Sequence, residues 1–177
     1  LSTRLFLILT LALFSVSSTS IVIRYVAGVP ALTLAFWRML SASGMLWSYS
    51  RFTVLKPLSR ANKIRIVLAG ISLGFHVSFF FIGVRYTTIE HATLFATTGS
   101  FFTTIFSLLL GQKIHRKIFI GLAFAIIGFI IIQGSDFNIG AKFLYGNLIS
   151  LLSGFCIAVT YIFASKIRED TENVVYG

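Results

Sequence analysis

Apolar residues along this chain are grouped in long blocks that are separated by short polar stretches. They do not form the stripes of a soluble amphipathic helix, and blocks of about 20 apolar residues are long enough to span a bilayer. We predict six spans, at residues 5–26, 31–50, 64–86, 91–110, 118–133 and 144–166. In lipid, backbone polar groups must be bonded within the segment, which favours helices over the alternating pattern of a barrel strand. The sequence therefore predicts an all-α membrane protein, a polytopic helical bundle of about six transmembrane helices.

Composition supports this class and excludes others. Of the 177 residues, 56% are hydrophobic and 11% are charged, whereas soluble domains carry about 25% charged residues. The formal net charge of +10 does not predict a nucleic-acid partner, because the basic residues lie in short loops between apolar blocks. The single cysteine, Cys156, lies inside an apolar block, so no disulfide within the chain, no metal cluster and no cofactor are predicted.

The distribution of basic residues predicts the orientation of the spans. One side of the predicted bundle carries Arg24, Arg85 and Lys142. The other side carries most of the fifteen: Arg4, Arg51, Lys56, Arg60, Lys63, Arg65, Lys113, Arg116, Lys117, Lys166 and Arg168. Because basic loops stay in the cytoplasm, we expect a cytoplasmic N-terminus in a multi-pass protein of the plasma (cell inner) membrane.

The first block allows a second interpretation. Residues 5–13 are followed by the small-residue stretch FSVSSTS, which is typical of a cleaved signal peptide. The apolar run continues through IVIRYV, which favours a transmembrane span.

Four stretches together resemble the EamA domain of the drug/metabolite transporter superfamily. They are VPALTLAFWRML, FFFIGVRYTTIEHATLFATTGSFFTTIFSLLLGQKI, IFIGLAFAIIGFIIIQG and YGNLISLLSGFCIAVTYIFASKIR, in the order of that domain's helices. The resemblance implies a ten-helix carrier made of two five-helix repeats. Residues 1–135 would form repeat one, and residues 136–177 the start of repeat two. Since five spans is an odd number, the second repeat enters the membrane from the opposite side, so the repeats are inverted.

Two positions depart from the pattern of this family. Thr98, Gly99 and Ser100 stand where the fourth helix of the family carries a proline, and Gln112 follows Gly111 where the family has glutamate. We expect the Gly99–Ser100 pair to bend the helix without the proline.

Arg38 is the main candidate for a functional residue, because a charge inside a span is costly and usually faces a cavity or a partner. In one interpretation it lines a pathway and attracts an anionic or zwitterionic group; in the other it is a structural tie to backbone carbonyls or a polar neighbour. No Asp or Glu lies deep in a predicted span, and Glu90 is at the mouth of the fourth. A proton/cation exchange that depends on a mid-membrane glutamate, as the small multidrug exporters of the superfamily use, is therefore disfavoured.

Other side chains within the predicted spans are further candidates for the pathway. His76 is either a proton relay or, as we favour, a neutral histidine hydrogen-bonded between helices. The remaining pathway candidates are Phe36 and Trp37 as walls, the hydroxyls of Ser17, Ser18, Thr97, Ser100 and Thr104, and Tyr161. Hydroxyls also join helices to one another, so each has a structural alternative. The stripe of Gly70, Gly74 and Ser78 on the third span is expected to pack tightly against a neighbouring helix.

These features favour a secondary transporter, one that is not driven by ATP, since no nucleotide-binding motif is present. We expect it to export a small metabolite by alternating access. Its expected partners are the solute, the lipid bilayer and either the missing second half of the same protein or a homodimer partner. The alternative is a non-transporting membrane scaffold or assembly subunit. A membrane enzyme is not favoured, because the sequence holds no catalytic constellation.

Overall fold

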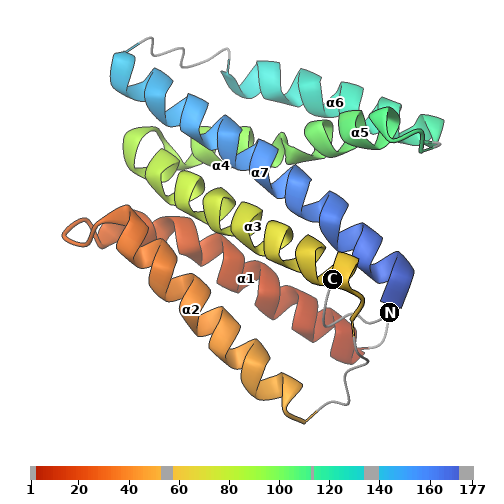
Figure 1. The fold of residues 1–177 in the computed structure, drawn as a ribbon. Helices are drawn as coiled ribbons and strands as arrows, with labels where there is room; N and C mark the ends of the chain where they lie inside the picture. Colours follow the sequence, from red (N-terminus) through yellow and green to blue (C-terminus); the bar gives the residue numbers. More distant parts are fainter. Residues whose placement is uncertain (1–2, 53–57, 113, 134–139, 172–177) are drawn as a thin grey trace.

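The computed structural model describes residues 3–52, 58–112, 114–133 and 140–171, and over these ranges it contains helices and no strands. The helices are α1 (Thr3–Tyr25), α2 (Ala31–Ser50), α3 (Arg60–Tyr86), α4 (Ile89–Thr97), α5 (Gly99–Leu109), α6 (Arg116–Gln133) and α7 (Ala141–Thr171). Because α4 and α5 continue one another, they form one broken span (Figure 1). The predicted all-α bundle is confirmed. The predicted repeat boundary after residue 135 lies outside the described residues, as do Lys56 and Lys113.

Four of these segments are long and apolar enough to cross a membrane. They are Leu5–Tyr25, Arg60–Tyr86, Ile89–Leu109 and Ala141–Ile167. The predicted spans at 31–50 and 118–133 are found as the helices α2 and α6, of 20 and 18 residues, but these are not among the candidate membrane spans of the described residues. Successive spans run in opposite directions, so their ends gather at two ends of the bundle (Figure 1). The described basic residues Arg51, Arg60 and Arg116 lie at helix ends that share one of these sides.

Short sequence signals set the helix ends. Pro30 is the N-cap of α2, and the hydroxyls of Ser59 and Thr88 accept hydrogen bonds from backbone N–H groups in the first turns of α3 and α4, each at 3.2 Å. These bonds satisfy donors that a helix start leaves free. Helix α5 ends at Leu109 with Leu110 as its C-cap, and the next residue, Gly111, has a φ of 73°, in the left-handed region that glycine adopts readily.

The fourth span breaks at Thr98, as the Gly99–Ser100 pair predicts. Thr98 has a ψ of −9°, and its Oγ1 donates a hydrogen bond to the carbonyl oxygen of Phe95 at 2.6 Å. Such a bond from a side chain to the preceding turn bends a helix. The expectation of a bend without the family's proline is therefore confirmed.

Helix α7 is the centre of the packing. It lies against α3 and against the broken α4–α5 span, while α1 and α2 contact α3 on the side away from α7 (Figure 1). Helix α6 lies at the margin of the bundle (Figure 1). Most apolar side chains face outward, as a bilayer requires, and the buried core between α1, α2, α3 and α4 is small: Ile23, Ala35, Val77, Phe81, Val84 and Ala92.

Glycine and serine allow α7 to approach its neighbours at backbone distance. A Cβ atom on Gly146 would lie 2.7 Å from the backbone nitrogen of Thr87, and one on Gly154 would lie 2.9 Å from the carbonyl oxygen of Phe95. Between them, Ser150 packs directly on Gly83 of α3. These residues repeat every four positions along α7, which is the spacing of close helix packing in membranes.

The stripe predicted on α3 does not pack in this way. No atom of the described residues lies within 4 Å of the position that a Cβ atom on Gly70 or Gly74 would take. Gly83, further along α3, makes the close contact instead. The expectation was wrong because spacing identifies a small-residue face but not the helix that will cover it.

Two arginines join α1 and α3 at the ends of these helices. Arg24, in the last turn of α1, donates to the carbonyl oxygen of Thr87 at 2.9 Å, and Arg85, in the last turn of α3, donates to the carbonyl oxygens of Val26 and Val29 at 2.7 and 2.6 Å. Each cation therefore satisfies carbonyls that the other helix leaves free at its C-terminal end. We call this pair of contacts the arginine clasp.

Because Gly146 is enclosed by backbone atoms, we predict that Gly146→Ala destabilises the bundle by about 1–3 kcal/mol. The thermal unfolding midpoint of the purified protein in detergent measures the effect. Gly74→Ala is the matched control, since its surroundings are open, and it should leave the midpoint unchanged or raise it slightly. An unchanged midpoint for Gly146→Ala would contradict the close packing of α7.

Candidate functional site

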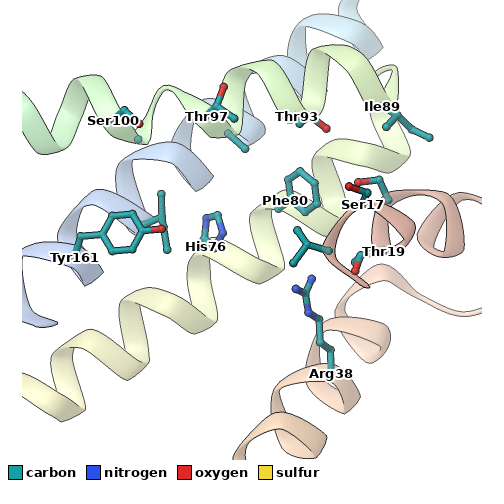
Figure 2. A pocket seen from close by; sticks show the side chains of 15 residues that line it. Ser17, Thr19, Arg38, His76, Phe80, Ile89, Thr93, Thr97, Ser100 and Tyr161 are labelled. Atoms are coloured by element: carbon teal, nitrogen blue, oxygen red, sulfur yellow. The ribbon is translucent and has the colours of Figure 1, made fainter. Parts of the chain in front are cut away.

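A cavity of about 570 Å³ lies among the helices that pack around α3 and α7. Its wall is formed by α1, α2, α3, the α4–α5 span and α7, so it gathers residues from across the whole described chain (Figure 2). Polar groups in the lining are one guanidinium, one imidazole, one phenol and several aliphatic hydroxyls. Such a concave site, mostly apolar with a few convergent polar groups, is typical of small-molecule binding.

Six of the ten predicted pathway residues line this cavity. They are Ser17, Arg38, His76, Thr97, Ser100 and Tyr161. They come from five separate segments of the chain, and Figure 2 shows their side chains around one shared space. The structure thus brings together residues that the sequence could place only within the predicted spans.

The other four predicted residues lie outside the lining. Phe36 and Trp37 pack edge to face on each other, with ring centroids 5.9 Å apart, and both rings are mostly exposed. The hydroxyls of Ser18 and Thr104 donate to carbonyl oxygens of their own helices, those of Ser15 and Ser100, at 3.0 and 2.9 Å. Trp37 and Ser18 point about 100° away from their neighbours Arg38 and Ser17 around the helix, and in this structure that direction lies outside the lining.

Arg38 extends from α2 toward the cavity (Figure 2). The carbon at the centre of its guanidinium lies 5.7 Å from the centroid of the Phe81 ring on α3, which is a cation–π contact. Ala35, one turn earlier, is buried in the core and fixes this face of α2 against α3. No Asp or Glu is among the described residues that line the cavity.

His76 joins α3 to α7 and also faces the cavity. Its Nδ1 lies 2.9 Å from the carbonyl oxygen and 2.8 Å from the Oγ of Ser153, and that Oγ lies 3.0 Å from the carbonyl oxygen of His76. All three contacts are satisfied when Nδ1–H donates to Ser153 and the Ser153 hydroxyl donates to the His76 carbonyl. In this arrangement the imidazole is neutral with its proton on Nδ1, and Nε2 is left as a hydrogen-bond acceptor. His76 therefore both links α3 to α7 by hydrogen bonds and lines the cavity.

Sequence reasoning did not select several lining residues, among them Thr19, Ser20, Phe80, Thr93 and Ile157. One signal was available for Thr93, which precedes Thr97 by four positions and therefore shares its helical face. Ile157 stands in the same relation to Tyr161. For Thr19 and Ser20, the hydroxyls of the stretch 15–20 surround the helix, so only the tertiary structure shows which of them point inward.

A second hollow of about 290 Å³ lies beyond Tyr161. Thr103, Ser107 and Gln112 line it from the α5 side, and Ser165 from α7. Tyr161 lines both hollows. Polar groups therefore continue from the main cavity toward the end of α5, the side on which the basic loops lie.

Comparisons with known proteins agree with this architecture. The model of the EamA-like transporter family matches residues 3–134. A protein of Archaeoglobus fulgidus named as an uncharacterized transporter is 28% identical over 138 residues, which cover 75% of this chain and 47% of that protein. The chain thus spans about half the length of this curated relative. No solved structure matches the chain at comparable significance.

Because the thiolate, which forms in water and not in lipid, is the nucleophile that attacks a methanethiosulfonate and displaces its sulfinate, cysteines at cavity positions should react with a charged reagent of this kind. In a Cys156→Ala background, we predict that Ser17→Cys reacts on the order of ten times faster than its neighbour Ser18→Cys. The rate of labelling in membranes, read by mass spectrometry, is the measurement. Equal rates at the two positions would contradict a water-accessible cavity at this face of α1.

Proposed function

This chain belongs to the EamA-like transporter family, and on that premise we propose that it moves a small metabolite across the membrane by alternating access, without ATP. The single observation that carries this proposal is the polar cavity between the helices. Polar groups within membrane-spanning segments are costly when they face lipid. Their convergence on one space from five segments gives a solute a place to shed its water and be bound.

We propose that residues 1–135 form the first of two five-helix repeats and that residues 136–177 begin the second. The length of the curated relative, of which this chain spans about half, supports this organisation. The position of α7 supports it as well, because α7 packs centrally against α3, α4 and α5 rather than at an edge. An inverted second repeat would complete the cavity, since transporters built from inverted repeats place the substrate near the midplane between them.

The proposed orientation has the N-terminus in the cytoplasm of a plasma-membrane protein. In a Cys156→Ala background, we predict that a membrane-impermeant maleimide added to intact cells labels Gly28→Cys, in the exposed connection between α1 and α2, but not Ala61→Cys at the start of α3. Permeabilisation should expose Ala61→Cys, because basic loops stay in the cytoplasm. The reverse pattern would invert the topology.

Transport itself can be tested without knowing the solute. Inside-out vesicles that hold the whole protein are incubated with an isotope-labelled metabolite extract, and mass spectrometry identifies what accumulates. For export, we predict accumulation in inside-out but not in right-side-out vesicles, and a loss of about tenfold or more for Arg38→Ala, the order expected when a hydrogen bond to a charged group is removed. Folded protein, judged by size-exclusion profile, should be unaffected.

Arg51→Ala is the matched control for this experiment, since Arg51 is the C-cap residue of α2 and, like Arg38, lies over an aromatic ring, that of Trp47, but is outside the cavity lining. It should leave accumulation unchanged. If the whole protein moves no component of the extract and Arg38→Ala alters only assembly, a scaffold function replaces transport.

A further inference from the structure

Two arginines near the core, Arg24 and Arg85, are held by hydrogen bonds to the protein backbone. Arg24 and Arg85 donate to backbone carbonyl oxygens at distances down to 2.9 and 2.6 Å. Arg38 has a different environment, because the contact that the structure gives its guanidinium is the face of Phe81 at 5.7 Å. A ring face attracts a cation, but it accepts none of the five N–H donors of a guanidinium in the plane where carboxylates bind.

The cavity contains no compensating acid among the residues that the structure describes. Its lining combines the Arg38 cation with neutral hydroxyls, the phenol of Tyr161 and the imidazole of His76. A permanent charge inside a membrane protein is stable when it faces a partner or water. Arg38 is exposed to the cavity, so water can hydrate it when the cavity is empty, and an anionic solute can replace that water and leave again.

Resting on the proposed function, we propose that the solute is a small organic monocarboxylate, whose carboxylate binds Arg38 and whose apolar body lies against Phe80 and Ile157. Guanidinium and carboxylate match each other as two parallel N–H···O hydrogen bonds. The hydroxyls of Thr97 and Ser100 stand across the cavity from Arg38 (Figure 2), where they can bond a polar group at the far end of the solute.

The charge of the lining favours this class over two others. A phosphate ester carries close to two negative charges near neutral pH, whereas the described lining supplies one permanent cation. An organic cation would meet Arg38 as a like charge, with no lining carboxylate to offset the repulsion. A single negative charge leaves the occupied cavity electrically neutral, which lowers the cost of carrying it through the membrane.

The test compares three probes that share one ring and differ in charge: phenylacetate, phenylacetamide and phenethylammonium. The whole protein is purified in detergent, and each probe is titrated while the thermal unfolding midpoint is followed. We expect phenylacetate to raise the midpoint, phenylacetamide to raise it less, and phenethylammonium to have no effect. For Arg38→Gln, binding of phenylacetate should weaken by about tenfold or more, and Arg38→Lys should restore part of it.

Arg51→Gln, at the C-cap of α2, is the control for a general loss of positive charge, and it should bind phenylacetate as the unchanged protein does. The inference is overturned if phenylacetate stabilises the protein no more than phenethylammonium, or if Arg38→Gln binds phenylacetate with unchanged affinity. Vesicle accumulation separates this inference from the proposed function. Accumulation of cationic solutes alone would support the transport function and contradict the carboxylate as solute. Arg38-dependent binding of phenylacetate without accumulation of any solute would support the carboxylate site and contradict transport.

Discussion

The close approach of α7 to α3 and to the α4–α5 span is the contact on which the rest of the described structure depends. Gly146, Ser150 and Gly154 bring backbones together where larger side chains would hold them apart. In lipid, helices gain little from hiding apolar surface, so dense packing and interhelical hydrogen bonds must hold them. The same contact places Ser153 at His76 and directs Ile157 and Tyr161 into the cavity. Helix α7 therefore both holds the described helices together and supplies residues of the candidate site.

The arginines of this bundle differ in whether backbone carbonyl oxygens are within their reach. In the arginine clasp, charge is satisfied by helix ends, where carbonyl oxygens are free and negative. Arg38 lies too far along α2 to reach such an end, so it turns toward the interior. Arginine thus joins helices at their ends, while in our proposal Arg38 binds solute in the middle of α2, and the difference comes from the availability of backbone acceptors.

The large apolar surface of the bundle is consistent with the proposed second repeat. Phe6, Leu11 and Met45 are 61%, 74% and 74% exposed, which suits contact with lipid or with further helices. The cavity is bounded by α1, α2, α3, the α4–α5 span and α7, and the helices of the proposed second repeat would lie beside it. Arg38 would then be less exposed to water than it is in the described structure, and a buried cation is more stable with an anion beside it.

The sequence alone determined the fold class and the places of the helices, four of which are long and apolar enough to cross a membrane, because lipid imposes a length and an apolar composition that can be counted residue by residue. The second span was predicted at 31–50, and α2 has these bounds; the bend near Gly99 was predicted from local chemistry. Only the tertiary structure decided which helix faces meet. It left Gly70 and Gly74 uncovered and turned Ser17, not Ser18, toward the cavity. In a uniformly apolar segment the sequence does not indicate which face of the helix points inward, and contact with a neighbouring helix decides it.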